Sequence, residues 1–156
     1  MTHKRIALIC LLGLSALFTG CIYDKTASNY AGKDTIVMEG DQIGINKAFV
    51  IKETEGKFST QFDFNGTYTL WQFDSVEENL IFDYELELKK GDLKLVIIDP
   101  QNKITTVFEQ NGKGKITGSE NFKLSKGHYR MKLVSKSNSE GKISLKVNCG
   151  TVSGGE

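Results

Sequence analysis

The sequence is poor in the residue types that most often carry catalysis, metal binding or covalent cross-links. Its 156 residues include two histidines, three cysteines, one proline and one tryptophan. Only His128 lies beyond the first few residues, and one histidine cannot build a two-histidine metal site. No glycine-rich phosphate-binding motif is present. The 20 basic and 19 acidic residues nearly balance, so the basic excess typical of nucleic-acid-binding proteins is missing and no nucleic-acid partner is expected.

The N-terminus has the pattern of an export signal. Lys4 and Arg5 precede an uncharged, mostly apolar run that covers residues 6–18. The apolar core of a signal peptide has about 7–15 residues, whereas a helix that spans a membrane needs roughly 20. Residues 1–20 are therefore expected to form a helical signal peptide and not a transmembrane anchor.

A short motif closes the apolar run: Leu17, Phe18, Thr19, Gly20 and Cys21 follow one another. It resembles the lipobox of bacterial lipoproteins, although Phe18 is bulkier than the usual leucine. The resemblance implies cleavage between Gly20 and Cys21 and a diacylglycerol joined to the Cys21 thiol, with no other cofactor. Two acyl chains anchor a protein stably. The chain is thus expected on the extracytoplasmic face of the cell membrane; the alternative is an ordinary secretory signal with a coincidental cysteine.

The remaining cysteines predict a domain without an internal disulfide bond. Cys10 lies in the signal peptide, and Cys21 is consumed by the lipid, which leaves Cys149 without a partner. No basic or histidine-rich neighbourhood in the sequence lowers the pKa of the Cys149 thiol. We interpret it as a passive thiol near the end of the last strand, so the domain must be held by its hydrophobic core.

The rest of the chain divides into a tether, one domain and a tail. Residues 21–34 are polar and aperiodic and predict a lipidated, flexible tether, and residues 150–156 predict a flexible tail. Between them, residues 35–149 form the expected domain. Apolar and polar residues alternate with a period of two over residues 57–64, 80–89, 128–133 and 142–147. Residues 93–98 are apolar on both faces apart from Lys94, which indicates a central strand.

Turn residues separate these runs, and no convincing helical stripe follows the signal peptide. The expected turns cover residues 89–92, 99–103, 111–112, 125–127 and 138–141. Pro100 stands where a type I turn favours proline. Many short strands with regular turns predict an all-β fold, a single antiparallel β-sandwich of jelly-roll-like type.

Strand-and-turn patterns recur through the second half of the chain, in residues 82–88, 91–95, 98–103 and 126–133. With Gly127 and Tyr129 opening a late strand, they resemble the jelly-roll sandwich of bacterial pre-peptidase C-terminal domains. The resemblance covers about half of the chain beyond the signal peptide. It departs from the family at Asn102 and Lys103, where glycine is usual. It implies a non-catalytic module, in some members stabilised by calcium or able to bind substrate.

One charged row and one group of turn residues are candidate cation sites. One face of a single predicted strand carries Asp83, Glu85 and Glu87. This row is a candidate site for a cation or a partner. The alternative is a solvated face opposite basic residues of a neighbouring strand. The basic residues expected on outer faces are Arg130, Lys132 and Lys146. Calcium prefers several oxygen ligands from one loop, and the turn residues Asp92, Asp99 and Asn102 are a weak substitute, so no metal site is predicted.

Tyr68, Trp71 and Phe73 form a candidate ligand platform, because sugars stack on exposed aromatic rings. Strict alternation puts Trp71 and Phe73 on one face and Tyr68 on the other. Aromatic residues are more often buried than exposed, so a place in the core is the alternative.

These patterns predict a membrane-anchored extracytoplasmic lipoprotein whose sandwich is a non-catalytic binding or interaction module at the cell envelope. The expected partners are the membrane, through the lipid, and a cell-wall glycan or an envelope protein. Scarce histidine disfavours an enzyme, although plentiful carboxylates leave a small envelope-acting hydrolase as an alternative. An immunity or inhibitor lipoprotein that protects its own cell is another.

Overall fold

A computed structural model of the chain describes residues 32–54, 57–76 and 79–149. The predicted signal peptide, Gly20, Cys21 and the predicted tail lie outside the described residues. The elements are α2 (Lys33–Val37), β1 (Ile43–Thr54), β2 (Lys57–Ser75), β3 (Asn79–Lys90), β4 (Asp92–Ile98), β5 (Ile104–Asn111), β6 (Gly114–Lys123) and β7 (Gly127–Cys149). Within these ranges no helix has the length and apolarity needed to cross a bilayer.

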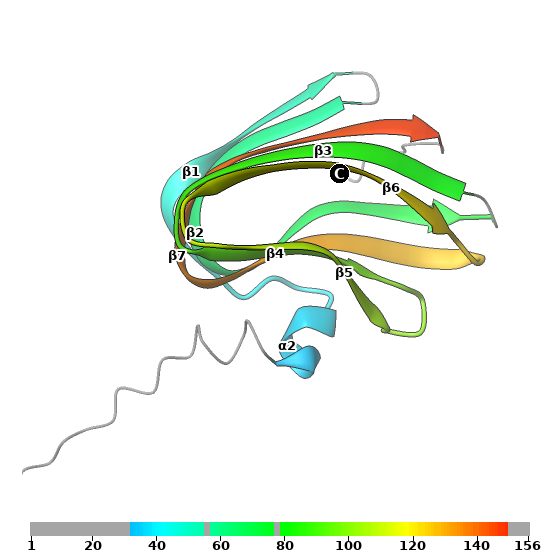
Figure 1. Ribbon diagram of the computed structural model, residues 1–156. Helices are drawn as coiled ribbons and strands as arrows, with labels where there is room; N and C mark the ends of the chain where they lie inside the picture. Colours follow the sequence, from blue (N-terminus) through cyan, green and yellow to red (C-terminus); the bar gives the residue numbers. More distant parts are fainter. Residues whose placement is uncertain (1–31, 55–56, 77–78, 150–156) are drawn as a thin grey trace, which may run out of the picture.

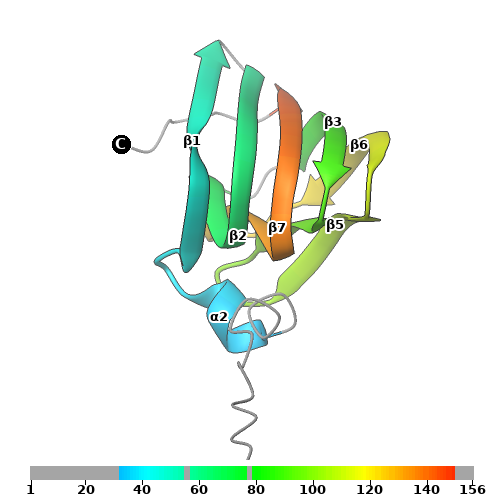
Figure 2. The ribbon, with the colours of Figure 1, turned by 90° about the vertical axis from the view of Figure 1, so that its left-hand side faces the viewer.

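The strands form one antiparallel sheet that folds over into two layers (Figure 1). The upper layer of Figure 1 contains β1, the first part of β2, the last part of β7, β3 and β6. The lower layer contains the last part of β2, the first part of β7, β4 and β5. Figure 2 shows the neighbouring order of β1, β2 and β7. The predicted all-β, jelly-roll-like sandwich is confirmed.

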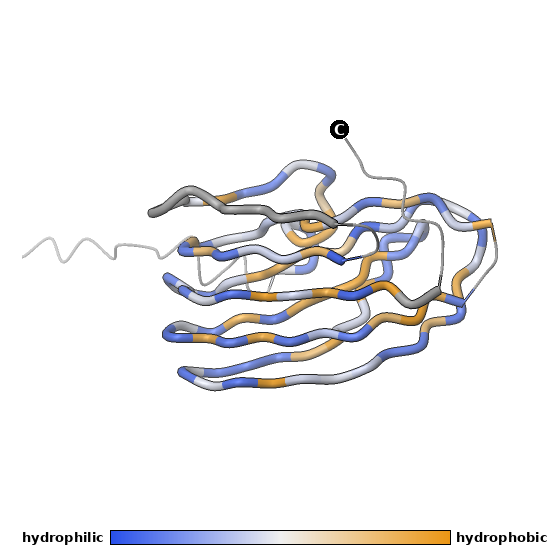
Figure 3. Tube along the Cα trace, turned by 90° about the horizontal axis from the view of Figure 1, so that it is seen from above, coloured by the Kyte–Doolittle hydropathy of each residue, from blue (hydrophilic) through white to orange (hydrophobic). Residues whose placement is uncertain are grey.

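The core lies between the layers and follows from the alternation in the sequence. Along β3, Leu80, Phe82, Leu86 and Leu88 are buried, while the residues between them are more exposed. Figure 3 shows the same alternation of hydrophilic and hydrophobic residues along the upper layer. The main core also holds Phe62, Phe64, Leu70, Phe73, Leu93, Leu95, Ile97, Phe108, Leu124, Tyr129, Met131, Leu133, Ile143 and Leu145.

Two strands connect the layers by bending, where the sequence predicts separate strands. The predicted turn at residues 138–141 is wrong, because these residues continue β7. The hydroxyl of Ser135 lies within hydrogen-bonding distance of the carbonyls of Phe64, at 3.3 Å, and Ser137, and of the Ser139 hydroxyl, at 2.7 Å. Ser139 in turn donates to the carbonyl of Asp92 at 3.0 Å. These buried serines form hydrogen bonds with backbone groups at the bend. The polar residues at 138–141 therefore lie at a bend within one strand and not at a turn that reverses the chain.

The predicted turn around Pro100 is present. The amide of Asn102 donates to the carbonyl of Asp99 at 2.9 Å, and this turn places β5 antiparallel to β4. The predicted turn at residues 111–112 is wrong, because it does not reverse the chain. β5 pairs with β4 and β6 pairs with β3, and β3 and β4 follow one another along β7, so Gly112, with a positive φ of 69°, carries the chain from the lower layer to the upper one.

The outer face of the lower layer is covered by residues 32–42, which we call the strap. The strap includes the five-residue helix α2, which the sequence does not predict. Ile36 is 2% exposed and packs with Val96, Ile98 and Val134 in a second small core. This contact explains why β4 is apolar on both faces: one face meets the main core and the other meets the strap.

The strap also corrects the prediction that Arg130 and Lys132 lie on an open outer face. They do point to the outer side of the lower layer, but the strap buries them, to 6% and 0% exposure. Their cationic groups bind backbone carbonyls of the strap. Alternation along the strand gives the correct side of the layer, whereas the covering segment comes from about 90 residues earlier in the chain.

Candidate functional site

The outer face of the upper layer carries ordered rows of polar side chains. In one row, Lys146 of β7 lies between Lys57 of β2 and Asp83 of β3. In the next row, Glu85 of β3 lies between Ser144 of β7 and Thr117 of β6. Residues directly opposite one another on one face of a sheet are near neighbours. The register therefore gathers residues from four strands into one polar surface.

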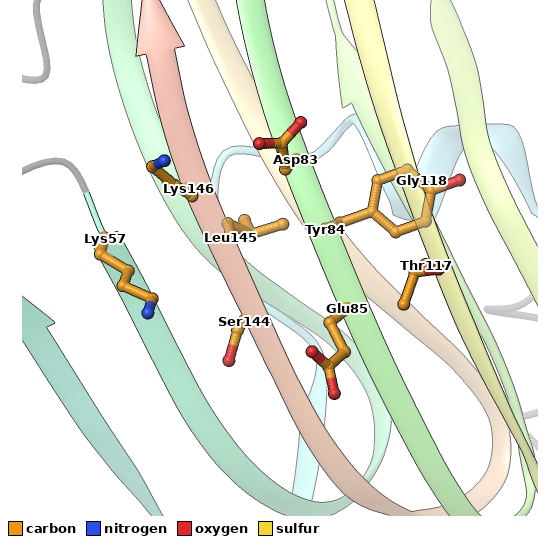
Figure 4. Close-up of a pocket in the computed structure, with 9 residues that line it drawn as sticks. All are labelled: Lys57, Asp83, Tyr84, Glu85, Thr117, Gly118, Ser144, Leu145 and Lys146. Carbon is orange, nitrogen blue, oxygen red and sulfur yellow. The ribbon is translucent and has the colours of Figure 1, made fainter.

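An open hollow of about 390 Å³ lies in this surface. Figure 4 shows that its residues come from neighbouring strands, with Lys57 on β2 and Thr117 and Gly118 on β6 at opposite sides. Ser144 is a small residue among the longer charged side chains, whereas the space beside Gly118 is occupied by the ring of Tyr84. The lining residues are Lys57, Asp83, Tyr84, Glu85, Thr117, Gly118, Ser144, Leu145 and Lys146.

Lysines pair with two members of the predicted acidic row. Glu85 is 2.7 Å from the Lys115 ammonium group, and Glu87 is 3.1 Å from that of Lys142. The hydrogen bond from Lys115, together with its charge, lowers the pKa of the Glu85 carboxyl below its ordinary value. Glu85 is therefore a carboxylate at neutral pH. The interpretation of the row as a solvated face opposite basic residues matches this geometry, with Lys115 and Lys142 as the partners.

The charge of the hollow itself is mixed. Lys57 and Lys146 stand opposite each other, and neither forms an ion pair within the described part of the chain. Like charges directly opposite one another destabilise a sheet slightly. Asp83, which has interactions of its own, lies on the other side of Lys146. The hollow thus offers ammonium and hydroxyl donors next to carboxylate acceptors.

Nothing in the described residues forms a metal site. No group of three or more histidine, cysteine, aspartate or glutamate side chains is placed to hold an ion there. The turn residues considered as calcium ligands accept hydrogen bonds from backbone amides and from Arg130 instead. Asp99 accepts from the amides of Gln101 and Lys103, Asp92 accepts from the amide of Gly112, and Asn102 accepts from Arg130.

The three aromatic residues of the predicted platform lie inside the sandwich. The rings of Trp71 and Phe73 stack at 4.3 Å, and Phe73 also stacks on Tyr129 at 5.5 Å. Phe73 is only 5% exposed, and Trp71 is partly buried. The structure thus places this pair in the core and not on an open surface. Among the described residues, the buried Nε1 of Trp71 has no hydrogen-bond partner.

The prediction that Tyr68 points away from Trp71 is wrong. The register shifts between Thr69 and Trp71, so Tyr68 is opposite Leu133 and Trp71 is opposite Met131, both core residues. One extra residue in a strand reverses the alternation beyond it. Tyr68 therefore packs against the main core together with Trp71 and Phe73.

His128 is exposed, as the sequence indicates, but it is not idle. Its ring nitrogens lie 2.9 Å from a carboxylate oxygen of Asp74 and 3.1 Å from the side-chain oxygen of Gln72. The backbone of Cys149 pairs with Ile81 at the end of β7, which agrees with the predicted place of this residue at the end of the last strand. Its side chain lies outside the described part of the structure.

Most of the hollow cannot be recognised from the sequence. The sequence singles out Asp83, Glu85 and Lys146 among its lining residues, but not Lys57, Thr117 or Ser144. The alternation assigns each of these residues to an outer face, and that is the only signal present. Which outer positions become neighbours depends on the pairing of β2, β7, β3 and β6, which a single sequence does not give.

No protein-family model matches the sequence, and no curated protein matches it. Several solved structures show a distant likeness, among them the following three. The carbohydrate-binding module TmCBM61, in complex with β-1,4-galactotriose, is 12% identical with a TM-score of 0.44 and covers 73% of this chain and 88% of that chain. A mutant family 29 carbohydrate-binding module complexed with mannohexaose is 9% identical, with a TM-score of 0.41 over 69% of this chain and 77% of that chain. An exo-β-1,3-galactanase from Phanerochaete chrysosporium is 16% identical, with a TM-score of 0.40 over 70% of this chain and 27% of that chain.

Proposed function

We propose that the chain is a non-catalytic binding module, anchored at the extracytoplasmic face of the cell membrane by a diacylglycerol on Cys21. Its ligand is a cell-wall glycan, and its binding site is the hollow on the upper layer. The observation that supports this proposal most directly is the hollow itself, in which polar side chains from four strands surround a small open space. The lipobox motif supports the anchor.

The side chains around the hollow fit a ligand with many hydroxyl groups. Each sugar hydroxyl both donates and accepts hydrogen bonds. Lys57 and Lys146 supply donors, Asp83 supplies an acceptor, and Ser144 and Thr117 supply groups that do both. The mixture of charges also disfavours a ligand with a strong net charge of one sign.

Glu85 does not fit the role of the acid in glycoside hydrolysis. That reaction needs one carboxyl group with a raised pKa to protonate the leaving oxygen, beside a second carboxylate. Glu85, which lies on the same strand as Asp83, has a lowered pKa because Lys115 binds it. A lowered pKa makes Glu85 a poor proton donor, so the alternative of an envelope-acting enzyme gains no support from the hollow.

Replacing Lys146 by alanine tests the site. We expect the variant to bind glycan fragments released from purified bacterial cell wall about 10- to 100-fold more weakly, since a hydrogen bond to a charged group is worth about 1.5–3 kcal/mol. Calorimetric titration of the detergent-solubilised full chain measures the affinity. Lys142→Ala is the matched control, because this lysine is on the same strand and face but outside the hollow.

Equal affinities for Lys146→Ala and the parent chain would contradict the proposed site. No glycan binding by the parent chain would contradict the proposed ligand. Capture of an envelope protein that Lys146→Ala fails to capture would instead favour the alternative of a protein partner on the same face.

Replacing Cys21 by alanine tests the anchor. The variant is expected to lose all incorporation of radiolabelled fatty acid and to leave the membrane fraction, because no thiol remains to accept the diacylglycerol. Cys149→Ser is the control and should keep both the label and the membrane attachment. Continued labelling of Cys21→Ala would rule out the anchor.

A further inference from the structure

The strap is built into the fold by its side chains and by its backbone. Ile36 fills the small core on the outer face of the lower layer. Arg130 donates to the carbonyl of Val37 at 2.8 Å. The ammonium group of Lys132, at 0% exposure, donates to the carbonyls of Met38 and Gly40 at 2.6 and 3.2 Å. The two buried cations thus bind three backbone carbonyls of the strap.

The end of the strap also closes the free edge of the lower layer. Beyond residue 66, β2 pairs only with β7 among the described strands, which leaves its other edge open. Asp41 accepts from the amide of Thr69 at 2.7 Å and from its hydroxyl at 2.8 Å. Gln42 and Thr67 exchange two further hydrogen bonds, at 2.8 and 3.0 Å. Asp41 is also 3.2 Å from the ammonium group of Lys132. The end of the strap is therefore bound both by the edge of β2 and by the buried cation.

The strap and the hollow lie on opposite sides of the sandwich. Figure 1 shows α2 beneath the lower layer, whereas the hollow is formed by strand segments of the upper layer. The chain from Cys21 to residue 32 spans at most about 40 Å. If the strap were undocked, the tether would extend to β1 at residue 43 and reach nearly twice as far.

We infer that the strap is a mount: it attaches the tether to the lower layer, so that this layer lies toward the membrane and the hollow is directed away from it. The inference rests on the proposed anchor at Cys21. A tether that began at β1 would join the upper layer, the layer that carries the hollow. The mount therefore decides which face of the sandwich a ligand outside the membrane can reach.

Two measurements on the full chain test the mount. The first is hydrogen exchange of the Thr67 and Thr69 amides, which donate only to the strap on this edge. We expect their exchange to be slowed by on the order of 100-fold or more relative to an unfolded chain. Exchange at the unfolded rate would show that the strap is not docked and would overturn the inference.

The second measurement places a fluorescent amino acid at Lys103, in the turn after β4 of the lower layer, or at Thr117, in the hollow. The chain is purified from bacterial membranes and reconstituted in phosphatidylcholine vesicles with a headgroup-attached quencher. We expect stronger quenching at Lys103 than at Thr117. In the Asp41→Ala variant, which loosens the strap but keeps the two cations, this difference should shrink or vanish.

The outcomes separate the mount from the anchor on which it rests. A chain that stays on the vesicles with equal quenching at both positions keeps the anchor and overturns the mount. A chain that does not associate with the vesicles overturns both. An unchanged difference in Asp41→Ala, with fast exchange at Thr67, whose acceptor Gln42 the substitution leaves in place, would show that the strap does not set the orientation.

Discussion

Replacing Lys132 by alanine is expected to lower the free energy of unfolding by about 3 kcal/mol or more. The side chain is fully buried, and its ammonium group is bound to two strap carbonyls and to Asp41. Burial lowers the pKa of Lys132 below its ordinary value of 10.5, while the charge of Asp41 acts in the opposite direction. Truncation leaves these acceptors without their donor and opens a cavity under the strap.

Urea unfolding followed by fluorescence measures this loss, because the only tryptophan, Trp71, is stacked inside the sandwich. Lys142→Ala is the matched control on the same strand. Its ion pair with Glu87 is exposed at the surface, so its loss should cost less than about 1 kcal/mol. Lys132→Met, which fills most of the space without the charge, separates the cavity from the lost hydrogen bonds. Equal losses for Lys132→Ala and Lys142→Ala would contradict a structural role of the buried cation.

Lys132 also shows where prediction from the sequence ends. The alternation of Tyr129, Met131 and Leu133 with the residues between them places Lys132 on the face away from the core, and it is on that face. Side-chain alternation is a local property of a strand, and for this reason the strands, the core positions and the all-β class follow from the sequence. What covers a face is a long-range property. The strap meets Lys132 from more than 90 residues away, and no local pattern announces that contact.

The bends and the bulge limit the prediction in another way. Polar residues and glycine at positions 138–141 have the composition of a turn, but the serines bind backbone groups across a crease within β7. In β2, one register shift brings Tyr68 to the face of Trp71. The same dependence on register hides the hollow: Lys57, Ser144 and Thr117 become neighbours only once four strands are paired. Outer-face positions are predictable, whereas their grouping into a site requires the structure.

Replacing Gly66 by alanine is the second change with a large expected effect. Gly66 lies at the bend of β2 with a positive φ of 97°, and a Cβ atom there would be 1.9 Å from the carbonyl oxygen of Gln42. That carbonyl belongs to the strap and accepts from the amide of Thr67. Alanine therefore meets both an unfavourable backbone conformation and a backbone atom that has to move. We expect a loss of about 3 kcal/mol in the free energy of unfolding.

Gly112→Ala isolates the conformational part of this effect. Gly112 also has a positive φ, of 69°, but a Cβ there would have nothing within 4 Å, so its substitution should cost only about 1 kcal/mol. The difference between the two variants measures how closely the strap approaches the bend. It should be accompanied by faster hydrogen exchange of the Thr67 amide in Gly66→Ala but not in Gly112→Ala, because only the first displaces its acceptor. Equal losses of stability in the two variants, with unchanged exchange at Thr67, would show that the strap moves away from the methyl group without loss of stability. That result would contradict a strap held in place by Lys132 and Arg130.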